Sequence, residues 1–423
     1  MKTFVFVLVT ASLLLAACGS SAAPAASTGP VTISMMMWGD PAELEVWNQI
    51  VADFHQANPN ITVKVDVSDW DSYWTKLKTM LSAGTPPDVF AMDAPLYLDY
   101  QSRGVLLNLQ PYLDKNPDML KDVYPQTLEA YKTPDGMYGL PRDFQTIVLF
   151  YNKDMFDAAG VAHPTANWTY DDLRSAAKSL TKVGADGKTT QYGFYADPWD
   201  MELIWSEGIW ANGGDVISTD HTKTLIGEPK AREVWQFFHD MMFVDKSWPT
   251  STVAQEYGGD PFLAGAAAMT TIGHWAIPGY SEAKFKWDIA PMPKGASGPA
   301  TSVNSAGFVV GKASKNPDAA FEFLKYVVSA PAQTRLAQLG FAVPVLKTVA
   351  ESDAFLKQKT PITQQIFLDS LAFAHMKPVF KGYDEWSSTI GDGMAPIWTG
   401  AAELNPTLDT VIPAADEVLA KNK

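Results

Sequence analysis

The first hundred residues alternate between two hydrophobic periods, one typical of strands and one typical of helices. Apolar residues that run together or alternate predict three short strands, over 31–37, 61–67 and 88–92. Apolar residues at helical spacing predict two helices between them, over 41–57 and 71–83. A β-α-β-α-β order implies a parallel sheet covered by helices, so the expected fold class is α/β.

The rest of the chain continues this mixed pattern without an internal repeat. Strands are expected over 146–151 and 285–293, and a third within the segment 265–275. Helices are expected from a Thr169–Asp172 capping box to residue 180, and from Asn316-Pro317 to residue 329. Residues 199–243 and 352–423 are predicted to be mostly helical, the latter with proline and glycine interruptions.

The N-terminus carries an export signal. Lys2 is the one charge before an apolar run over residues 4–15, which is too short to span a bilayer. The run ends in Leu15-Ala16-Ala17-Cys18, and Cys18 is the single cysteine of the chain. This arrangement resembles the lipobox of bacterial lipoproteins, so residues 1–17 are expected to be removed and Cys18 to be lipidated. The alternative is an ordinary export signal with a chance cysteine.

Residues 18–30 are small, polar or proline, and predict a flexible tether to a lipid anchor. No later segment is long and apolar enough to predict a transmembrane helix. The expected location is therefore extracytoplasmic, anchored to the cell membrane.

Charge and composition narrow the class of ligand. The 423-residue chain has a net charge of -15, which argues against a nucleic-acid partner. Only five arginines are present, and arginine is the usual partner of carboxylates and phosphates. The 14 tryptophans, 15 tyrosines and 21 phenylalanines favour a surface for a neutral polyol, although about half of these rings are expected to belong to the core.

Enzymatic chemistry has little support in the sequence. The six histidines lack metal-binding spacing, and there is no second cysteine, no G-x-S-x-G motif and no P-loop. No metal site and no cofactor are expected. A carbohydrate hydrolase or lyase remains an alternative because two carboxylates across a cleft cannot be recognised by spacing. A binder of a peptide or a metal complex is the other alternative.

Several segments, in their order along the chain, resemble the extracellular sugar-binding proteins of ABC importers, the family that includes maltose-binding protein. They are Trp38-Gly39-Asp40, Pro86-Pro87-Asp88-Val89, Gly139-Leu140-Pro141, Tyr151 to Phe156, Asn167 to Leu173, Gly265 to Met269, Gly273-His274-Trp275, Ala319 to Leu324, and Gly340 to Pro344. The individual pieces are common, and their shared order is what carries the resemblance.

This resemblance implies a periplasmic-binding-protein fold with two lobes, a hinge and an interlobe ligand cleft. Lobe 1 would comprise 31–143 plus 292–344, and lobe 2 would comprise 145–291 plus 346–423. The hinge crossings would fall near Phe144-Gln145, Pro291 and Val345. The function implied is a monomeric, non-enzymatic receptor that closes over a carbohydrate, an oligosaccharide by its aromatic content, and delivers it to an ABC permease.

Candidate ligand contacts follow from what a sugar presents. Flat aromatic rings cover the C–H faces of a pyranose, and carboxylates and amides accept hydrogen bonds from its hydroxyl groups. In this kind of fold such residues are expected in the loops that follow parallel strands. The candidates are Trp38, Asp40, Trp70, Asp93, Asp143, Gln145, Asp197, Trp199, Trp275, Asn304, Tyr383 and Trp386, with Trp275 the strongest because its family counterpart is a stacking platform. For Asp93 the alternative is a helix N-cap, and for Trp70 a packing role at the helix start.

Weaker candidates are Ser305 and Trp398. Trp205 and Trp210 fit either the cleft or the lobe interior. Trp235 and Trp287 fit core positions and are left out of the site.

Overall fold

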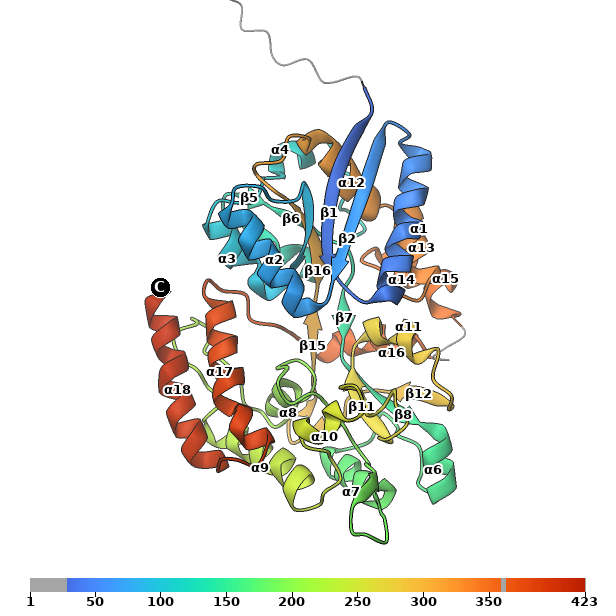
Figure 1. The fold of residues 1–423 in the computed structure, drawn as a ribbon, viewed down its shortest axis with the longest axis vertical. Helices are drawn as coiled ribbons and strands as arrows, with labels where there is room; N and C mark the ends of the chain where they lie inside the picture. The colour runs from blue at the N-terminus through green and yellow to red at the C-terminus, as the bar shows by residue number, and fades with distance from the viewer. Residues whose placement is uncertain (1–28, 359–362, 423) are drawn as a thin grey trace, which may run out of the picture.

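The computed structural model describes residues 29–358 and 363–422. The predicted signal peptide, Cys18 and most of the tether lie outside the described residues. Figure 1 shows two α/β bodies, one above the other, with the strands β7 and β15 running between them. The expected fold class, α/β in two lobes, is confirmed. No helix among the described residues is long and apolar enough to cross a membrane.

The upper body is built on a five-stranded sheet of order β2-β1-β3-β16-β6. Its strands are β1 (Val31–Trp38), β2 (Ile61–Ser68), β3 (Val89–Asp93), β6 (Gly139–Pro141) and β16 (Ala306–Val310). Strands β1, β2 and β3 are parallel, as the sequence predicts, and β16 is antiparallel to β3. Its longer helices are α1 (Pro41–Ala57), α2 (Trp70–Ser82), α12 (Pro317–Val327) and α13 (Ala330–Gln338).

The lower body holds a three-stranded antiparallel sheet of order β11-β8-β12. Its strands are β8 (Val148–Asn152), β11 (Met269–Ile272) and β12 (Trp287–Ala290). Its helices are α6 (Lys153–Ala159), α7 (Tyr170–Leu180), α8 (Trp205–Ala211), α9 (Pro229–Phe243), α10 (Ser251–Gln255), α17 (Tyr383–Trp398) and α18 (Leu404–Lys421). The predicted capping box at the start of α7 is confirmed. Residues 212–228, expected to be helical, are not, because turns with glycines at 213, 214 and 227 separate α8 from α9.

A small sheet joins the two bodies. It has the order β17-β15-β7, with β7 at Gln145–Thr146, β15 at Thr301–Asn304 and β17 at Ala374–Met376. Strand β15 continues through Ser305 directly into β16 of the upper sheet. Residues 294–299 bond to lower-body residues, since Lys294 N donates to Trp168 O at 2.8 Å and Ser297 N to Ala211 O at 2.7 Å. These contacts favour a second crossing at Ser305, later than the expected Pro291.

Contacts after residue 345 likewise favour a third crossing later than the expected Val345. The helix α14 (Lys347–Ala350) begins with Lys347 N donating to Asp122 O at 3.0 Å, and α15 (Asp353–Leu356) packs against α13 of the upper body. Helix α16 (Gln365–Asp369), in contrast, packs against β7, and Thr146 Oγ1 donates to Phe367 O at 3.0 Å. The chain therefore leaves the upper body after α15.

The remaining short elements connect these parts. They are α3 (Tyr97–Ser102), α4 (Gln110–Leu113), α5 (Pro125–Glu129), α11 (Ile277–Tyr280), β4 (Lys132–Thr133), β5 (Gly136–Met137), β9 (Lys182–Val183), β10 (Thr189–Gln191), β13 (Lys294–Gly295), β14 (Gly298–Pro299), η1 (Ala94–Leu96), η2 (His274–Ala276) and η3 (Ser370–Phe373).

Candidate functional site

Two adjoining cavities lie where the bodies face each other. The first, of about 290 Å³, is called the hinge-side cavity and is lined by Trp38, Glu43, Trp70, Asp93, Arg142, Asp143, Gln145, Asp200, Glu202, Trp275, Asn304, Ala306, Phe341 and Lys377. The second, of about 760 Å³, is called the α17-side cavity and includes Trp70, Trp74, Lys78, Asp93, Asp197, Trp199, Asp200, Met201, Trp205, Lys377, Tyr383 and Asp384. Four residues line both, so the cavities form one cleft.

Tryptophans from both bodies line this cleft. Trp70 is 45% exposed and Trp199 is 41% exposed, which is unusual for rings of this size. Trp38 meets Trp70 edge-on, with ring centroids 5.0 Å apart, and Trp275 lies half-buried in η2. Exposed flat rings over a cavity are platforms for the apolar face of a ligand.

Two residues that line the hinge-side cavity, Gln145 and Asn304, have side-chain amide oxygens without a hydrogen-bond partner among the described residues. Asn304 Nδ2 donates to Asp93 Oδ1 at 2.7 Å, and Gln145 Nε2 donates to Asp143 Oδ1 at 3.5 Å. An ionised carboxylate only accepts, so each one turns the amide nitrogen toward itself and leaves the amide oxygen unused. Asn304 Oδ1 and Gln145 Oε1 are therefore buried acceptors whose hydrogen-bonding capacity is not used by the described residues.

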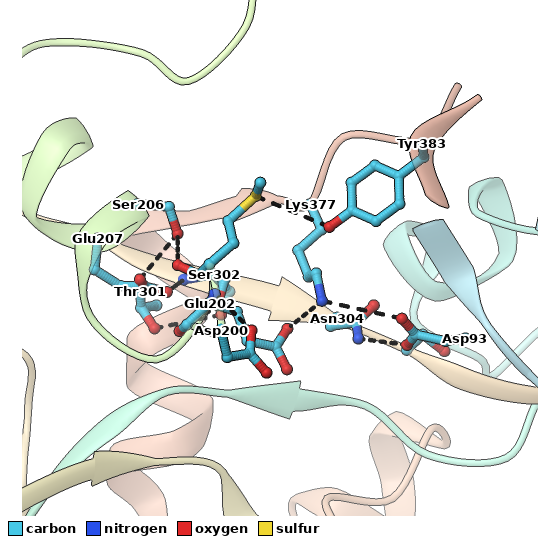
Figure 2. Close-up of polar contacts among 12 residues, drawn as sticks. Asp93, Asp200, Glu202, Ser206, Glu207, Thr301, Ser302, Asn304, Lys377 and Tyr383 are labelled. Atoms are coloured by element: carbon cyan, nitrogen blue, oxygen red, sulfur yellow. Dashed lines mark hydrogen bonds and ion pairs between the residues drawn. The ribbon is translucent and has the colours of Figure 1, made fainter. Parts of the chain in front are cut away.

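A buried ammonium group stands between the two bodies. Lys377 Nζ lies 2.9 Å from Glu202 Oε2 and 3.9 Å from Asp93 Oδ2, and the side chains of all three are at most 9% exposed. Asp93 ends β3 in the upper body, and Glu202 precedes α8 in the lower body. Figure 2 shows Lys377 reaching between these carboxylates, with Tyr383 beside its aliphatic stem.

Burial dominates the electrostatics of the cleft carboxyls. Desolvation raises the pKa of Asp93, against which the Lys377 ammonium and the Asn304 amide act. Desolvation likewise raises the pKa of Asp143, opposed by Arg142, whose Nε lies 3.0 Å from Asp143 Oδ2. The pKa of Asp197 is raised for the same reason. These carboxyls have lost water and gain from a ligand that restores hydrogen bonds.

Comparison with known proteins identifies the class. The model of the family described as bacterial extracellular solute-binding protein matches residues 38–334. The chain belongs to this family. A maltodextrin-binding protein of Bacillus subtilis is 27% identical, over 94% of this chain and 91% of the relative, and a galactooligosaccharide-binding protein of the same organism is 24% identical, over 98% and 96%. A solved ABC substrate-binding protein of Listeria monocytogenes, in complex with cycloalternan, has a TM-score of 0.85 at 26% identity, covering 92% of this chain and 99% of that one.

Membership in the solute-binding family confirms the expectation of an extracytoplasmic receptor rather than an enzyme. The structure of this solute-binding protein also brings most of the candidate residues into one cleft. The candidates that line it are Trp38, Trp70, Asp93, Asp143, Gln145, Asp197, Trp199, Trp275, Asn304 and Tyr383. They come from distant parts of the sequence, as the two-lobed arrangement requires.

Two candidates are placed elsewhere. Asp40 caps α1, where its Oδ1 accepts from Glu43 N at 2.8 Å, and it does not line either cavity. Trp386 is fully buried, with Nε1 donating to Thr224 Oγ1 at 2.9 Å. Asp40 satisfies a helix terminus and Trp386 fills the core, so these two candidates do not line the cleft of this structure, contrary to expectation.

The weaker candidates divide in the same way. Trp205 lines the α17-side cavity, whereas Trp210 stacks on His375 with ring centroids 4.6 Å apart. Trp398 packs against Trp235 in the core, and Ser305 is buried, with Oγ donating to Asp143 O at 2.9 Å. Trp235 and Trp287 are buried, as expected.

Sequence reasoning missed several charged residues of the cleft. Arg142, Asp200, Glu202 and Lys377 line it but were not among the candidates. Lys377 directly follows β17, and the rule that contacts follow strands would have found it. The signal was lost because the sequence predicts helix over 352–423, which hides the short strand.

Proposed function

We propose that this solute-binding protein captures a neutral oligosaccharide in the cleft, closes over it, and hands it to an ABC permease. The observation that carries the proposal is the pairing of exposed tryptophan faces with buried, unused amide oxygens along one cleft. A pyranose needs both kinds of surface, one for its C–H faces and one for its hydroxyls.

The comparisons support the class of ligand and the transport role. Relatives named for maltodextrin and galactooligosaccharide align over most of the chain, and a Streptococcus pneumoniae relative is named a maltooligosaccharide ABC transporter solute-binding lipoprotein. The cleft of about 760 Å³ beside one of about 290 Å³ also offers room for more than one sugar ring.

Within the site, each residue type has its own role. Trp70, Trp199 and Trp275 stack on sugar faces, and Trp38 supports Trp70 from behind. Asn304 and Gln145 accept hydroxyl hydrogens, held in orientation by Asp93 and Asp143. Asp197 and Tyr383 provide further polar contacts in the α17-side cavity.

Ligand binding closes two lobes about the β7, β15 and β17 sheet. Lobe 1 comprises 31–143 and 306–357, and lobe 2 comprises 145–304 and 365–422. These bounds follow the contacts of residues 294–299 and of α14 and α15. Residues that belong to different lobes face each other across the cleft, so a sugar bound to both favours the closed state.

The protein acts as a monomer, tethered to the outer face of a membrane by acyl groups on Cys18. The sequence Leu15-Ala16-Ala17-Cys18 supports the anchor, and two relatives are named lipoproteins. Several acyl chains bind a membrane stably where one does not. The small and polar sequence of residues 18–30 predicts a flexible tether between this anchor and the solute-binding body.

The alternatives have weaker support. No group of three or more histidine, cysteine or acidic side chains among the described residues is placed to hold a metal ion, so a metal-ion ligand has little support. An anionic ligand or a peptide carboxylate needs an available cation, but Arg142 and Lys377 are both ion-paired in the cleft. A hydrolase or lyase would stand outside the family.

A thermal-shift screen tests the proposal. The full chain, in mild detergent, is heated with maltotriose, mannotriose and galactooligosaccharides, and with amino acids, tripeptides and metal ions as controls. A ligand at 100 times its Kd stabilises by about 2.7 kcal/mol, which raises the Tm measurably. A shift with one neutral sugar supports the proposal, and a shift confined to peptides or metals overturns it.

A further inference from the structure

We propose that Lys377 is a positioning residue of the sugar site, which keeps the carboxylates of Asp93 and Glu202 in the form that accepts sugar hydroxyls. The inference rests on the proposed function and concerns a residue that does not itself have to contact the sugar. Lys377 directly follows β17, and its backbone N–H donates to Val303 O at 3.4 Å.

Lys377 lies where the two cavities adjoin, because it lines both the hinge-side and the α17-side cavity. Asp93 also lines both, and Glu202 lines the hinge-side cavity. A ligand that occupies both cavities therefore extends past residues that line both, and these include Lys377 and Asp93.

The Lys377 ammonium lies at different distances from the two carboxylates. Nζ lies 2.9 Å from Glu202 Oε2 but 3.9 Å from Asp93 Oδ2, too far for a hydrogen bond. Asp93 Oδ2 is therefore stabilised by the ammonium charge and keeps its lone pairs for another donor. Asp93 Oδ1 is occupied by Asn304 Nδ2. One carboxylate thus orients Asn304 through one oxygen and offers the other (Figure 2).

Acidic groups surround the Lys377 ammonium. Lys377 is faced by Asp93 from β3, by Asp200 and Glu202 from the segment before α8, and by Tyr383 from α17. Burial alone would lower the pKa of Lys377, but these groups raise it well above its usual value, so the ammonium stays charged. Buried carboxylates without such a cation take up protons instead.

Protonation of Asp93 or Glu202 would change how these groups bind a sugar. An ionised carboxylate only accepts hydrogen bonds, whereas a protonated carboxyl has an O–H donor and fewer free acceptor sites for a sugar hydroxyl. Burial raises the pKa of Glu202 to about 7, while Lys377 acts against that rise. The affinity for a neutral sugar is therefore expected to increase as the pH rises through about 7, and removal of the ammonium moves this step to higher pH.

The test is Lys377→Met, which keeps an unbranched side chain of similar length and removes the positive charge. The Kd of the full-length protein for maltotriose, mannotriose or galactotriose, whichever shifts the wild-type Tm most, is measured by calorimetry from pH 5.5 to 9.5. We expect Lys377→Met to bind at least tenfold more weakly at pH 7.5, with the step displaced upward by one pH unit or more. A uniform loss at every pH, with the step unmoved, would show a structural role and overturn the inference.

Glu202→Gln is the matched variant, since it keeps Lys377 and removes the titrating acceptor. It should bind more weakly than wild type at pH 8 and show no step near pH 7; if it retains the step, the inference is wrong even when Lys377→Met does not fold. Absence of sugar binding by the wild type would instead refute the proposed function, and this inference with it.

Discussion

Asp99 in α3 caps the N-terminus of α17 from the opposite lobe. Its Oδ1 accepts from Gly382 N at 2.6 Å and its Oδ2 from Asp384 N at 3.4 Å, while α17 has no side-chain cap of its own. Gly382 has a φ of +90°, a left-handed conformation that suits glycine at this position. Lys78 Nζ adds an ion pair to Asp384 Oδ2 at 2.9 Å. The lobes are thus linked at the α17-side cavity, away from the hinge sheet (Figure 1).

This cap predicts an effect of Asp99 on lobe closure. A carboxylate on a helix N-terminus is stabilising, and hydrogen bonds to a charged group contribute about 1.5–3 kcal/mol. Asp99→Ala should shift the unliganded protein toward an open form and weaken sugar binding by about fivefold or more, because closure must then be driven by ligand alone. A fluorophore pair with one dye on each lobe measures the distance change.

The control is Asp118→Ala, which removes an exposed carboxylate paired with Lys121 within lobe 1. It should change neither the interlobe distance nor the Kd. Equal distances for Asp99→Ala and wild type would mean that the cap does not hold the lobes together.

Trp275 is predicted to be a stacking platform. It lines the hinge-side cavity and is only half-buried, so its ring is available to a sugar face. Trp275→Ala should weaken binding by about 1–3 kcal/mol, roughly 5- to 200-fold in Kd, by the usual value of one stacked ring. Calorimetry with the sugar found in the thermal-shift screen gives this number directly.

Trp386→Phe is the matched control for that variant. Trp386 is fully buried and donates to Thr224 Oγ1, so the substitution should lower the Tm but leave the Kd unchanged. An unchanged Kd in Trp275→Ala would remove Trp275 from the site.

Asp40 is predicted to affect stability without affecting affinity. Its side chain accepts from Glu43 N at the start of α1, a cap that contributes about 0.5–2 kcal/mol to the free energy of unfolding. Asp40→Ala should lower the free energy of unfolding, measured by urea denaturation, by this amount. Asp40→Asn should retain most of the stability that the cap provides. A large loss of sugar affinity in Asp40→Ala would return this residue to the binding site.

The fold was accessible from the sequence where periodicity is strong. Helix α1 was predicted at its observed bounds, and the strands before and after it within one residue, because capping residues and prolines mark their ends. Strands of two to four residues, such as β7, β15 and β17, carry no periodicity. These strands form the hinge sheet, so no periodic pattern in the sequence marks the crossings that we propose at Ser305 and after α15.

The residues of the site could be predicted from the sequence only in part, for a similar reason. Aromatic residues after strands identified Trp70 and Trp275, because composition and position both pointed to the cleft. Trp386 has the same composition but faces the core, and only packing separates the two cases. The Lys377, Glu202 and Asp93 contacts join residues from three distant segments, which no local pattern reveals.

Glu207 predicts how stability depends on pH. It is fully buried beneath β15, and burial raises its pKa from 4.5 to about 8. Ser302 N donates to Oε1 at 3.0 Å, and Ser206 Oγ lies 3.0 Å from Oε2 and 2.5 Å from Met201 O, although its hydroxyl has one hydrogen for these two oxygens. A neutral carboxyl that donates to Ser206 Oγ satisfies all these groups, which agrees with the raised pKa.

Because the folded-state pKa lies above the unfolded value, the stability from Glu207 is fully present below pH 4.5 and is lost as pH rises to about 8. The expected slope reaches about 1.4 kcal/mol per pH unit within this window. Glu207→Gln mimics the neutral acid, so its free energy of unfolding should fall less than that of wild type between pH 5 and 8, and exceed it at pH 9. Urea titrations of both proteins at each pH measure the difference, and parallel curves would show that Glu207 is ionised in the folded state.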